Sequence, residues 1–368
     1  MSDKKTNLLD YDRSSLETYF IEMGDKSFRA RQVLKWIYHH GVTDFSAMTN
    51  LSKALRQQLE QNTCINLPKI VTEQKSSDGT RKWLVKIDDL NSVETVFIPE
   101  DDRGTLCISS QVGCPLDCKF CSTAQQGFNK NLSTSEIIGQ VWVANQALGY
   151  FEHGQRVITN IVFMGMGEPL LNYNNVLKAI NLLTDDLGFG LARRRVTVST
   201  SGIIPEIDRL KEESNVSLAI SLHASNNELR NNIVPINRSY PLKDLLVACK
   251  RFTQSRDNEP ITIEYVMLKG VNDSRQDALE LVKCLKGIPA KVNLIPFNTF
   301  PGTHYECSDM NTINSFRDVL IQSGIITITR KTRGDDIDAA CGQLVGKVIA
   351  KAAKHQRKNP GIPDAKLI

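Results

Sequence analysis

The stretch RVTVSTSGIIPEIDRLKEESNVSLAISLHA, residues 195–224, contains the pattern that decides the fold. Two short apolar runs typical of strands flank a helix-like segment. Similar runs recur along the chain: TLCISS (105–110), ITNIVFMGMG (158–167), ITIEYVML (261–268), KVNLIPFN (291–298) and IITITR (325–330). Because helix-like stretches lie between most of them, we predict a parallel α/β sheet, open or closed into a barrel.

The region before residue 100 has a different pattern. Residues 14–62 are predicted to be helical, because apolar residues recur three and four positions apart. The runs RKWLVKI (81–87) and SVETVFIP (92–99) are predicted to form a β-hairpin, joined by a polar turn. We therefore predict three regions: a helical domain ending in the hairpin (1–90), an α/β domain (91–346) and a basic tail (347–368).

Composition limits the class of protein. The chain has 368 residues, a net charge of +4 and nine cysteines. The polar N-terminus shows no apolar core of a secretory signal, and no run reaches the roughly 18 apolar residues that span a bilayer. We therefore expect a cytoplasmic protein without a membrane partner, in which clustered cysteines are metal ligands or catalytic thiols rather than disulfides.

The cysteines of Cys114-Pro-Leu-Asp-Cys118-Lys-Phe-Cys121 have C-x3-C-x2-C spacing. Three thiolates can bind three irons of a cubane cluster and leave the fourth iron open. The open iron can chelate the amino and carboxylate groups of S-adenosylmethionine and pass an electron to its sulfonium. The alternative is a structural zinc site, which usually takes four ligands in C-x2-C pairs. The nearest fourth candidate is Cys107, so the spacing favours iron–sulfur and leaves zinc open.

The aromatic residue before the last of these cysteines makes the motif resemble the radical-SAM signature. Further segments resemble cofactor-binding strand ends of that superfamily: Gly165–Pro169, Val196–Gly202, Ile220–Ala224 and Pro296–Asn298. Each alone is weak, since a Gly-x-Gly-Glu-Pro end is often a plain turn and a lone histidine is often structural. Together they imply a partial (βα)6-type radical-SAM barrel with a small N-terminal helical domain and a β-hairpin extension.

The resemblance also implies two sets of ligands. The [4Fe–4S] cluster would be held by Cys114, Cys118 and Cys121. S-adenosylmethionine would be bound by Gly167, Glu168, Ser199, Ser221, Leu222, His223 and Asn298.

Two longer segments narrow the resemblance to the RlmN family of adenine-C2 methyltransferases. They are TLCISSQVGCPLDCKFCSTAQQGFNKNL (105–132) and RGDDIDAACGQL (333–344). The related Cfr enzymes, which methylate C8 of adenine, remain an alternative. The RlmN resemblance implies that Cys341 carries the methyl group, that Cys107 resolves a covalent RNA adduct through a transient disulfide with Cys341, and that Glu94 is the proton acceptor. It also implies two S-adenosylmethionine molecules per turnover.

The residues themselves give a chemical reason for this arrangement. Carbon 2 of adenine lies between two ring nitrogens and is too electron-poor to attack a sulfonium methyl directly. The resemblance implies that a protein thiolate takes the methyl first. Strand alternation places Cys107 on the face of Thr105 and Ser109, opposite Leu106 and Ile108. Cys341 has small neighbours that leave room for a base. The alternatives are a core cysteine at either position and, for Glu94, a charge on an edge strand.

The expected partners follow from the family. They are 23S rRNA and tRNA, with the target adenine drawn out of the RNA into the barrel, and an electron-donor protein such as a flavodoxin. We expect a monomer. Basic clusters at 26–35, 193–195 and 347–358 are candidate RNA contacts or solvated surfaces. A zinc-containing RNA-binding module without catalysis is the remaining alternative, although it has no use for Cys341 or the Gly-Glu-Pro strand end.

Overall fold

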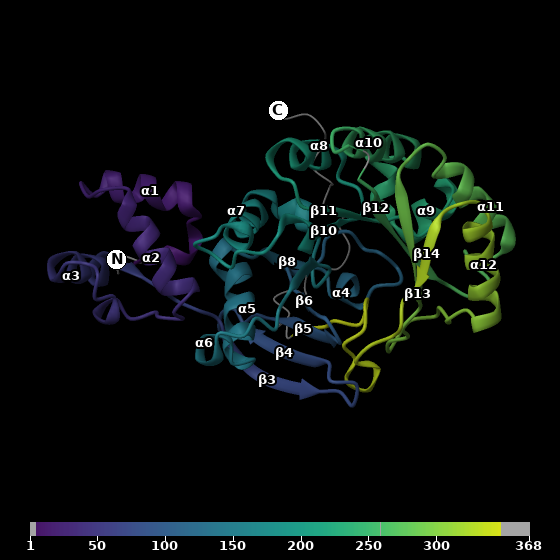
Figure 1. The fold of residues 1–368 in the computed structure, drawn as a ribbon. Coiled ribbons are helices and arrows are strands. Elements are labelled where there is room, and N and C mark those ends of the chain that lie inside the picture. The colour runs from purple at the N-terminus through teal and green to yellow at the C-terminus, as the bar shows by residue number, and fades with distance from the viewer. Residues whose placement is uncertain (1–4, 258, 347–368) are drawn as a thin grey trace.

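The computed structural model describes residues 5–257 and 259–346. Three helices form the N-terminal unit: α1 (Arg13–Glu22), α2 (Phe28–Tyr38) and α3 (Lys53–Asn62). Asp12 and Ser52 cap α1 and α3 by accepting hydrogen bonds from backbone N–H groups. Short strands β1 (Thr6–Asn7) and β2 (Thr63–Cys64) pair in parallel and close the unit. Figure 1 shows these helices at one end of the molecule, beside α5 and α7.

Within the described residues, the main sheet has ten strands in the order β14-β13-β12-β11-β10-β9-β6-β5-β4-β3. The parallel part contains β6 (Arg103–Cys107), β9 (Asn160–Phe163), β10 (Val196–Thr200), β11 (Ser217–Ser221), β12 (Ile261–Met267), β13 (Ala290–Pro296) and β14 (Ile326–Thr329). The antiparallel part contains β3 (Lys69–Lys75), β4 (Arg81–Lys86) and β5 (Ser92–Glu100). The sheet is open, with β14 and β3 at its two edges.

Helices connect the parallel strands and lie around the outside of the curved sheet (Figure 1). The longer ones are α5 (Thr134–Ala147), α7 (Tyr173–Thr184), α8 (Ile204–Glu213), α10 (Leu242–Gln254), α11 (Arg275–Cys284) and α12 (Met310–Gln322). The shorter ones are α4 (Ser122–Gln125), α6 (Tyr150–His153) and α9 (Asn227–Ile233). A separate pair, β7 (Gln111–Gly113) and β8 (Phe128–Asn131), brackets the cysteine motif.

The predicted parallel α/β sheet is confirmed, as are the helical N-terminal region and the hairpin of β4 and β5. Strand β3 was not predicted, because most of its side chains are exposed and its sequence, KIVTEQK, has no regular alternation. Since β3, β4 and β5 continue the main sheet, the hairpin is built into the same layer as the parallel strands. The domain boundary at residue 90 stays a prediction. The predicted basic tail, 347–368, lies outside the described residues.

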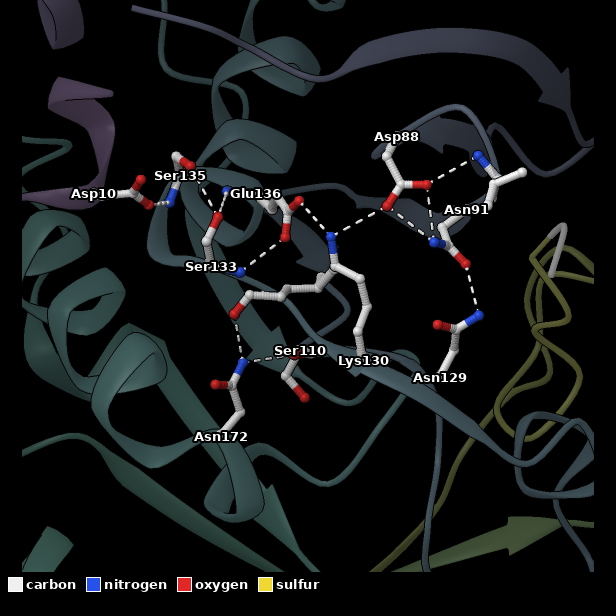
Figure 2. A network of polar contacts seen from close by, with 12 residues as sticks. Asp10, Asp88, Asn91, Ser110, Asn129, Lys130, Ser133, Ser135, Glu136 and Asn172 are labelled. Carbon is white, nitrogen blue, oxygen red and sulfur yellow. Dashed lines mark hydrogen bonds and ion pairs between the residues drawn. The ribbon is translucent and has the colours of Figure 1, made fainter. Parts of the chain in front are cut away.

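A polar network holds the strand that follows the cysteine motif (Figure 2). The Lys130 ammonium on β8 lies 3.3 Å from Asp88 Oδ2, in the β4–β5 turn, and 2.9 Å from Glu136 Oε1, in the first turn of α5. Asp10 accepts a hydrogen bond from the backbone N–H of Ser135 at 2.8 Å. The network therefore joins the N-terminal unit, the hairpin and β8.

The amide of Gln140, on α5, fixes the point where the chain leaves β6. Gln140 is completely buried. Its Oε1 accepts hydrogen bonds from Ser109 N at 2.9 Å and Thr95 Oγ1 at 2.8 Å, and its Nε2 donates to Ser109 O at 2.9 Å. One side chain thus satisfies both backbone groups of Ser109, five residues before the first cysteine of the motif.

Replacing Gln140 with Leu should lower the free energy of unfolding by about 3 kcal/mol, because the buried N–H and C=O of Ser109 would lose their partners. Urea unfolding followed by circular dichroism measures the change. Gln146→Leu is the matched control, since Gln146 lies exposed on the same helix and its replacement should change stability by less than about 0.5 kcal/mol. Equal stability of the two variants would contradict this account.

Candidate active site

The cysteine motif forms a loop closed by β7 and β8. Gly113, just before it, has φ 72°, and a Cβ at this position would lie 1.8 Å from the carbonyl oxygen of Gly127. Only glycine allows so close an approach of two backbones. Cys114 N then donates to the same carbonyl at 3.1 Å. The loop therefore starts and ends at a fixed backbone contact.

The thiols of Cys114, Cys118 and Cys121 are free and gather within the loop. Burial, and to a smaller extent neighbouring sulfur atoms, raise the pKa of all three, that of Cys118 to about 12. Arg230 acts in the opposite direction on Cys118. Burial disfavours the thiolate form of these cysteines. A bound metal centre would supply positive charge and deprotonate them, so the three thiols suit a metal-binding site.

The form of the group also points to a cluster. The donor set consists of three cysteine thiols from one short loop. In a cubane, each thiolate binds a different iron. The residues present therefore fit a [4Fe–4S] cluster.

Gly167 and Glu168 lie beyond the end of β9, next to β7. Gly167 has φ 100°, and a Cβ there would lie 2.5 Å from that of Gln111. The Glu168 carboxylate is 3% exposed and accepts hydrogen bonds from the backbone N–H groups of Leu170, at 3.1 Å, and Ser201, at 2.8 Å. Burial nevertheless raises its pKa to about 7. A buried carboxylate of this kind suits an ammonium ligand.

Ser221, Leu222 and His223 lie at the end of β11 and just beyond it. Ser221 Oγ lies 3.5 Å from Ser199 Oγ, on the neighbouring strand β10. His223 has φ 61°, and its Nδ1 accepts a hydrogen bond from Val266 N at 3.1 Å, which leaves the proton on Nε2. The ring of Phe120, inside the cysteine motif, packs edge-on against it with centroids 4.5 Å apart. The predicted serines and histidine therefore come together beside the motif.

A completely buried arginine supports these strand ends. The guanidinium of Arg230 donates hydrogen bonds to three backbone carbonyls: Leu222 O at 3.0 Å, Ser201 O at 2.7 Å and Ser221 O at 3.2 Å. Its remaining side-chain partner is Asn237 Oδ1 at 2.9 Å. Because Leu222 is wholly buried and its carbonyl is used by Arg230, its contact with any ligand would be apolar.

The predicted catalytic cysteines line a common cavity of about 900 Å³ inside the sheet. Cys107 lines it together with Thr105, as strand alternation predicts, and Cys341 lines it from the segment after β14. Burial and, to a smaller extent, the nearby sulfur of Cys341 raise the pKa of Cys107 to about 12, although Arg330 acts to lower it. The Cys341 sulfur is also near enough to Cys121 to contribute to its raised pKa. Cys341 thus lies between Cys107 and the cysteine motif.

The loop that carries Cys341 is anchored on two sides. Towards the motif, Ser122 N donates to Gly342 O at 2.8 Å and Thr123 Oγ1 donates to Leu344 O at 2.6 Å. Towards the end of β13, Asn298 Nδ2 donates to Cys341 O at 3.2 Å. Asn298 therefore touches the backbone of this loop as well as lining the cavity.

Glu94 holds the same loop from the hairpin. Its Oε2 accepts a hydrogen bond from Val345 N at 2.8 Å, and its Oε1 lies 3.3 Å from Lys82 Nζ. Lys82 in turn donates to Asp338 O at 3.1 Å. Glu94 and Lys82 are both buried and belong to strands β5 and β4. Together, Lys82 and Glu94 therefore bind the backbone of the Cys341 loop before and after the cysteine. Glu94 itself does not line the cavity.

Comparison with known proteins places this geometry in a family. A family model described as the ribosomal RNA large subunit methyltransferase N-terminal domain matches residues 6–65, and the radical SAM superfamily model matches residues 108–282. A radical SAM methyltransferase from Sphaerobacter thermophilus is 40% identical, with a TM-score of 0.85 over 92% of this chain and 99% of that one. The chain belongs to the RlmN family of radical SAM methyltransferases. The predicted radical-SAM type of fold is thereby confirmed.

Two more distant structures match parts of this RlmN-family chain. Streptococcus suis SuiB bound to S-adenosylmethionine is 12% identical over 66% of this chain and 57% of its own, with a TM-score of 0.45. A domain of pyruvate-formate lyase-activating enzyme from Bacteroides vulgatus is 16% identical over 47% and 99%, with a TM-score of 0.36. Membership of the radical SAM superfamily implies a [4Fe–4S] cluster and S-adenosylmethionine. In the described part of this chain, no helix has the length and hydrophobicity to cross a membrane.

Several polar residues of the site were not predicted from the sequence. Arg330, Glu264, Lys82 and Arg230 were all missed. Glu264 carried a signal, since it is the single charge inside the apolar run ITIEYVML. A charge in a strand expected to be buried on both faces must have a partner or a function.

The predicted basic clusters differ in their surroundings. Arg194 and Arg195 line the cavity, together with Lys291. On or next to α2, Arg29 lies 3.6 Å from Asp25 and Arg31 lies 3.2 Å from Glu17, as on a solvated helix face. The tail residues lie outside the described part of the chain.

Replacing Lys82 with Met should loosen the Cys341 loop, because Glu94 would remain buried without its cation and Asp338 O would lose a donor. We expect the free energy of unfolding to fall by about 3 kcal/mol and iodoacetamide to alkylate Cys341 several-fold faster, as measured by peptide mass mapping. Lys86→Met, at a half-buried position of the same strand whose ammonium pairs with the exposed Asp89 rather than with Glu94, is the control. An unchanged alkylation rate in Lys82→Met would contradict the role of Lys82 and Glu94 in holding the Cys341 loop.

Proposed function

We propose that this protein forms 2-methyladenosine in 23S rRNA and tRNA in the cytoplasm, through a methylated cysteine and a covalent enzyme–RNA adduct. The observation that carries the proposal is that Cys107 and Cys341 line the same cavity, and that Cys341 lies near Cys121 of the cysteine motif. A radical SAM enzyme without a protein-bound methyl group would need neither thiol there.

In this proposal, Cys114, Cys118 and Cys121 hold the cluster. The cofactor is bound by Gly167, Glu168, Ser199, Ser221, Leu222, His223 and Asn298. When bound, the [4Fe–4S] cluster and two S-adenosylmethionine molecules per turnover supply the methyl group and the radical that activates it. The buried carboxylate of Glu168 would take the ammonium of the methionine moiety, and Nε2–H of His223 is available as a donor.

Cys341 carries the carbon that is transferred. Its thiolate accepts the methyl group, and the activated carbon on its sulfur then adds to C2 of adenine, giving the adduct. One electron would pass from the adduct radical back to the cluster held by Cys114, Cys118 and Cys121, and a base would remove the C2 proton. The Cys107 thiolate then attacks the Cys341 sulfur: the S–S bond forms, the S–CH2 bond breaks, and its electron pair passes to the methylene carbon, which is protonated to a methyl group.

Glu94 is the proposed base. It is on the same face of β5 as Val96 and Ile98, both of which line the cavity. In the observed arrangement, Val345 N and Lys82 occupy its oxygens. Release of Val345 from the carboxylate would free an oxygen for the proton, so loop movement and proton removal would be coupled.

The RNA would present a single unstacked adenine to the cavity. Arg194 and Arg195, just before β10, and Lys291, near the start of β13, supply positive charge where phosphates next to the target could lie. The protein would act as a monomer, and an electron-donor protein such as a flavodoxin would reduce the cluster.

The reaction is tested with anaerobically reconstituted enzyme, S-adenosylmethionine, a reductant, and rRNA or tRNA that lacks the modification. Nucleoside mass spectrometry should find 2-methyladenosine in both RNAs, and Cys118→Ala should lose iron, inorganic sulfide and activity together. Formation of 8-methyladenosine would assign the chain to Cfr-like chemistry instead. Stoichiometric zinc without labile sulfide would support a non-catalytic RNA-binding module.

Cys107→Ala should trap the adduct, because no thiol remains to attack the Cys341 sulfur. We expect a protein–RNA species that survives denaturing electrophoresis and yields a Cys341 peptide linked to adenine. Cys249→Ala, at a buried cysteine on α10, serves as the control and should give no such species. Free, fully methylated RNA from Cys107→Ala at the normal rate would exclude the resolving role.

A further inference from the structure

A buried carboxylate on the cavity wall has an unused acceptor. Glu264 lies in the middle of β12 and is 3% exposed. Its Oε1 accepts a hydrogen bond from Asn293 Nδ2, on the neighbouring strand β13, at 2.9 Å. Its Oε2 has no hydrogen-bond partner among the described residues, and the nearest charge, Arg330 Nη1, is 3.8 Å away. That separation is too long for a hydrogen bond.

Arg330 connects this carboxylate to the predicted methyl-carrying thiol. It follows β14, and its backbone N–H donates to Leu294 O at 2.9 Å, which fixes its position across the sheet. Its guanidinium lies beside the Cys341 side chain, and the Cys341 sulfur, Glu264 and Cys107 together raise its pKa. The Arg330 side chain is 30% exposed and lines the cavity. The order along the wall is therefore Cys341, Arg330, Glu264.

We propose that Arg330 and Glu264 read the Watson–Crick edge of the target adenine, Arg330 donating to N1 and Glu264 Oε2 accepting from the exocyclic amine. The proposal rests on the proposed function and identifies residues that determine which base is accepted. Buried polar atoms normally have a hydrogen-bond partner. In this proposal the amine of the adenine is that partner for Glu264 Oε2.

The order of groups on the two partners agrees. Along the edge of adenine, C2 is followed by N1, an acceptor, and then by the amine on C6, a donor. Cys341, Arg330 and Glu264 present the reacting sulfur, a donor and an acceptor in the same order. Guanine has the opposite pattern, with N1–H as a donor and O6 as an acceptor, and would place a donor against Arg330. Proteins that act on extruded bases commonly recognise this edge.

The surroundings suit a base. The cavity volume of about 900 Å³ is within the range of small-ligand sites. A second buried polar atom on its wall, Thr329 Oγ1, also has no hydrogen-bond partner in the part of the chain that the structure describes. Asn293 holds the other oxygen of Glu264, so the free oxygen keeps its direction.

The test compares two RNA oligonucleotides, with adenosine or purine riboside at the target position. Purine riboside keeps C2–H and N1 but lacks the amine. Wild-type holoenzyme should methylate the adenosine RNA with a kcat/KM about 100-fold higher, the effect of one hydrogen bond to a charged group. In Glu264→Leu this ratio should fall to near 1, whereas Glu264→Gln, which keeps an acceptor, should retain part of it.

Thr262→Val is the matched control, because Thr262 lines the same cavity two residues earlier on β12. Its adenosine-to-purine ratio should equal that of the wild type. Methylation of Cys341 without RNA, seen as a mass increase of the protein, checks that each variant is folded and loaded. Equal rates of wild type on both RNAs, or an unchanged ratio in Glu264→Leu, would overturn this inference alone. No methylated product from wild type on either RNA would overturn the proposed function itself.

Discussion

The hydrogen bonds of Arg230 to the carbonyls of Ser201, Ser221 and Leu222 support the predicted cofactor site. A cation without exposure to water must be surrounded by acceptors, and here those acceptors are the backbone at the ends of two adjacent parallel strands. Arg230 consequently fixes the spacing of β10 and β11 just where Ser199, Ser221 and His223 face the cysteine motif. The motif itself needs the backbone contact at Gly113. It is also tied to α9, the helix of Arg230, because Lys119 N donates to Ile233 O at 3.1 Å, and the ring of Phe120 packs against His223.

The Cys341 loop is the link between the hairpin and the barrel. It is held by Glu94 and Lys82 from one side and by the motif from the other. Both sets of bonds go to the backbone of the loop, and the buried Gln343 side chain adds a third contact, because its Nε2 donates to Thr299 O at 3.0 Å. A loop fixed in this way keeps one sulfur close to three different groups: Cys121, Cys107 and Arg330.

Much of the fold could be predicted from the sequence because each parallel strand carries a run of buried apolar residues that stands out between helix-like segments. The alternate positions, such as Thr197, Thr262 and Glu264, face the cavity. Strand β3 could not be predicted, because pairing with β4 rather than burial defines it. The same division applies to the site. Spacing and family resemblance identified Cys107 and Cys341, and the structure brings them to one cavity. The pairing of Glu264 with Arg330 crosses over β13, from β12 to the end of β14, and no local pattern contains that information.

The open edges of the sheet bear on how the protein avoids aggregation. An uncovered edge strand presents unpaired backbone groups to other chains. At one edge, β3 carries exposed charges, including Lys69, Glu73 and Lys75, which oppose pairing with another chain. At the other edge, β14 exposes Ile326 and Ile328 but is only four residues long. The charges of β3 and the short length of β14 thus oppose pairing with the strands of another molecule. Lengthening β14, or replacing the charged residues of β3 with neutral ones, would make the folded enzyme prone to edge-to-edge association.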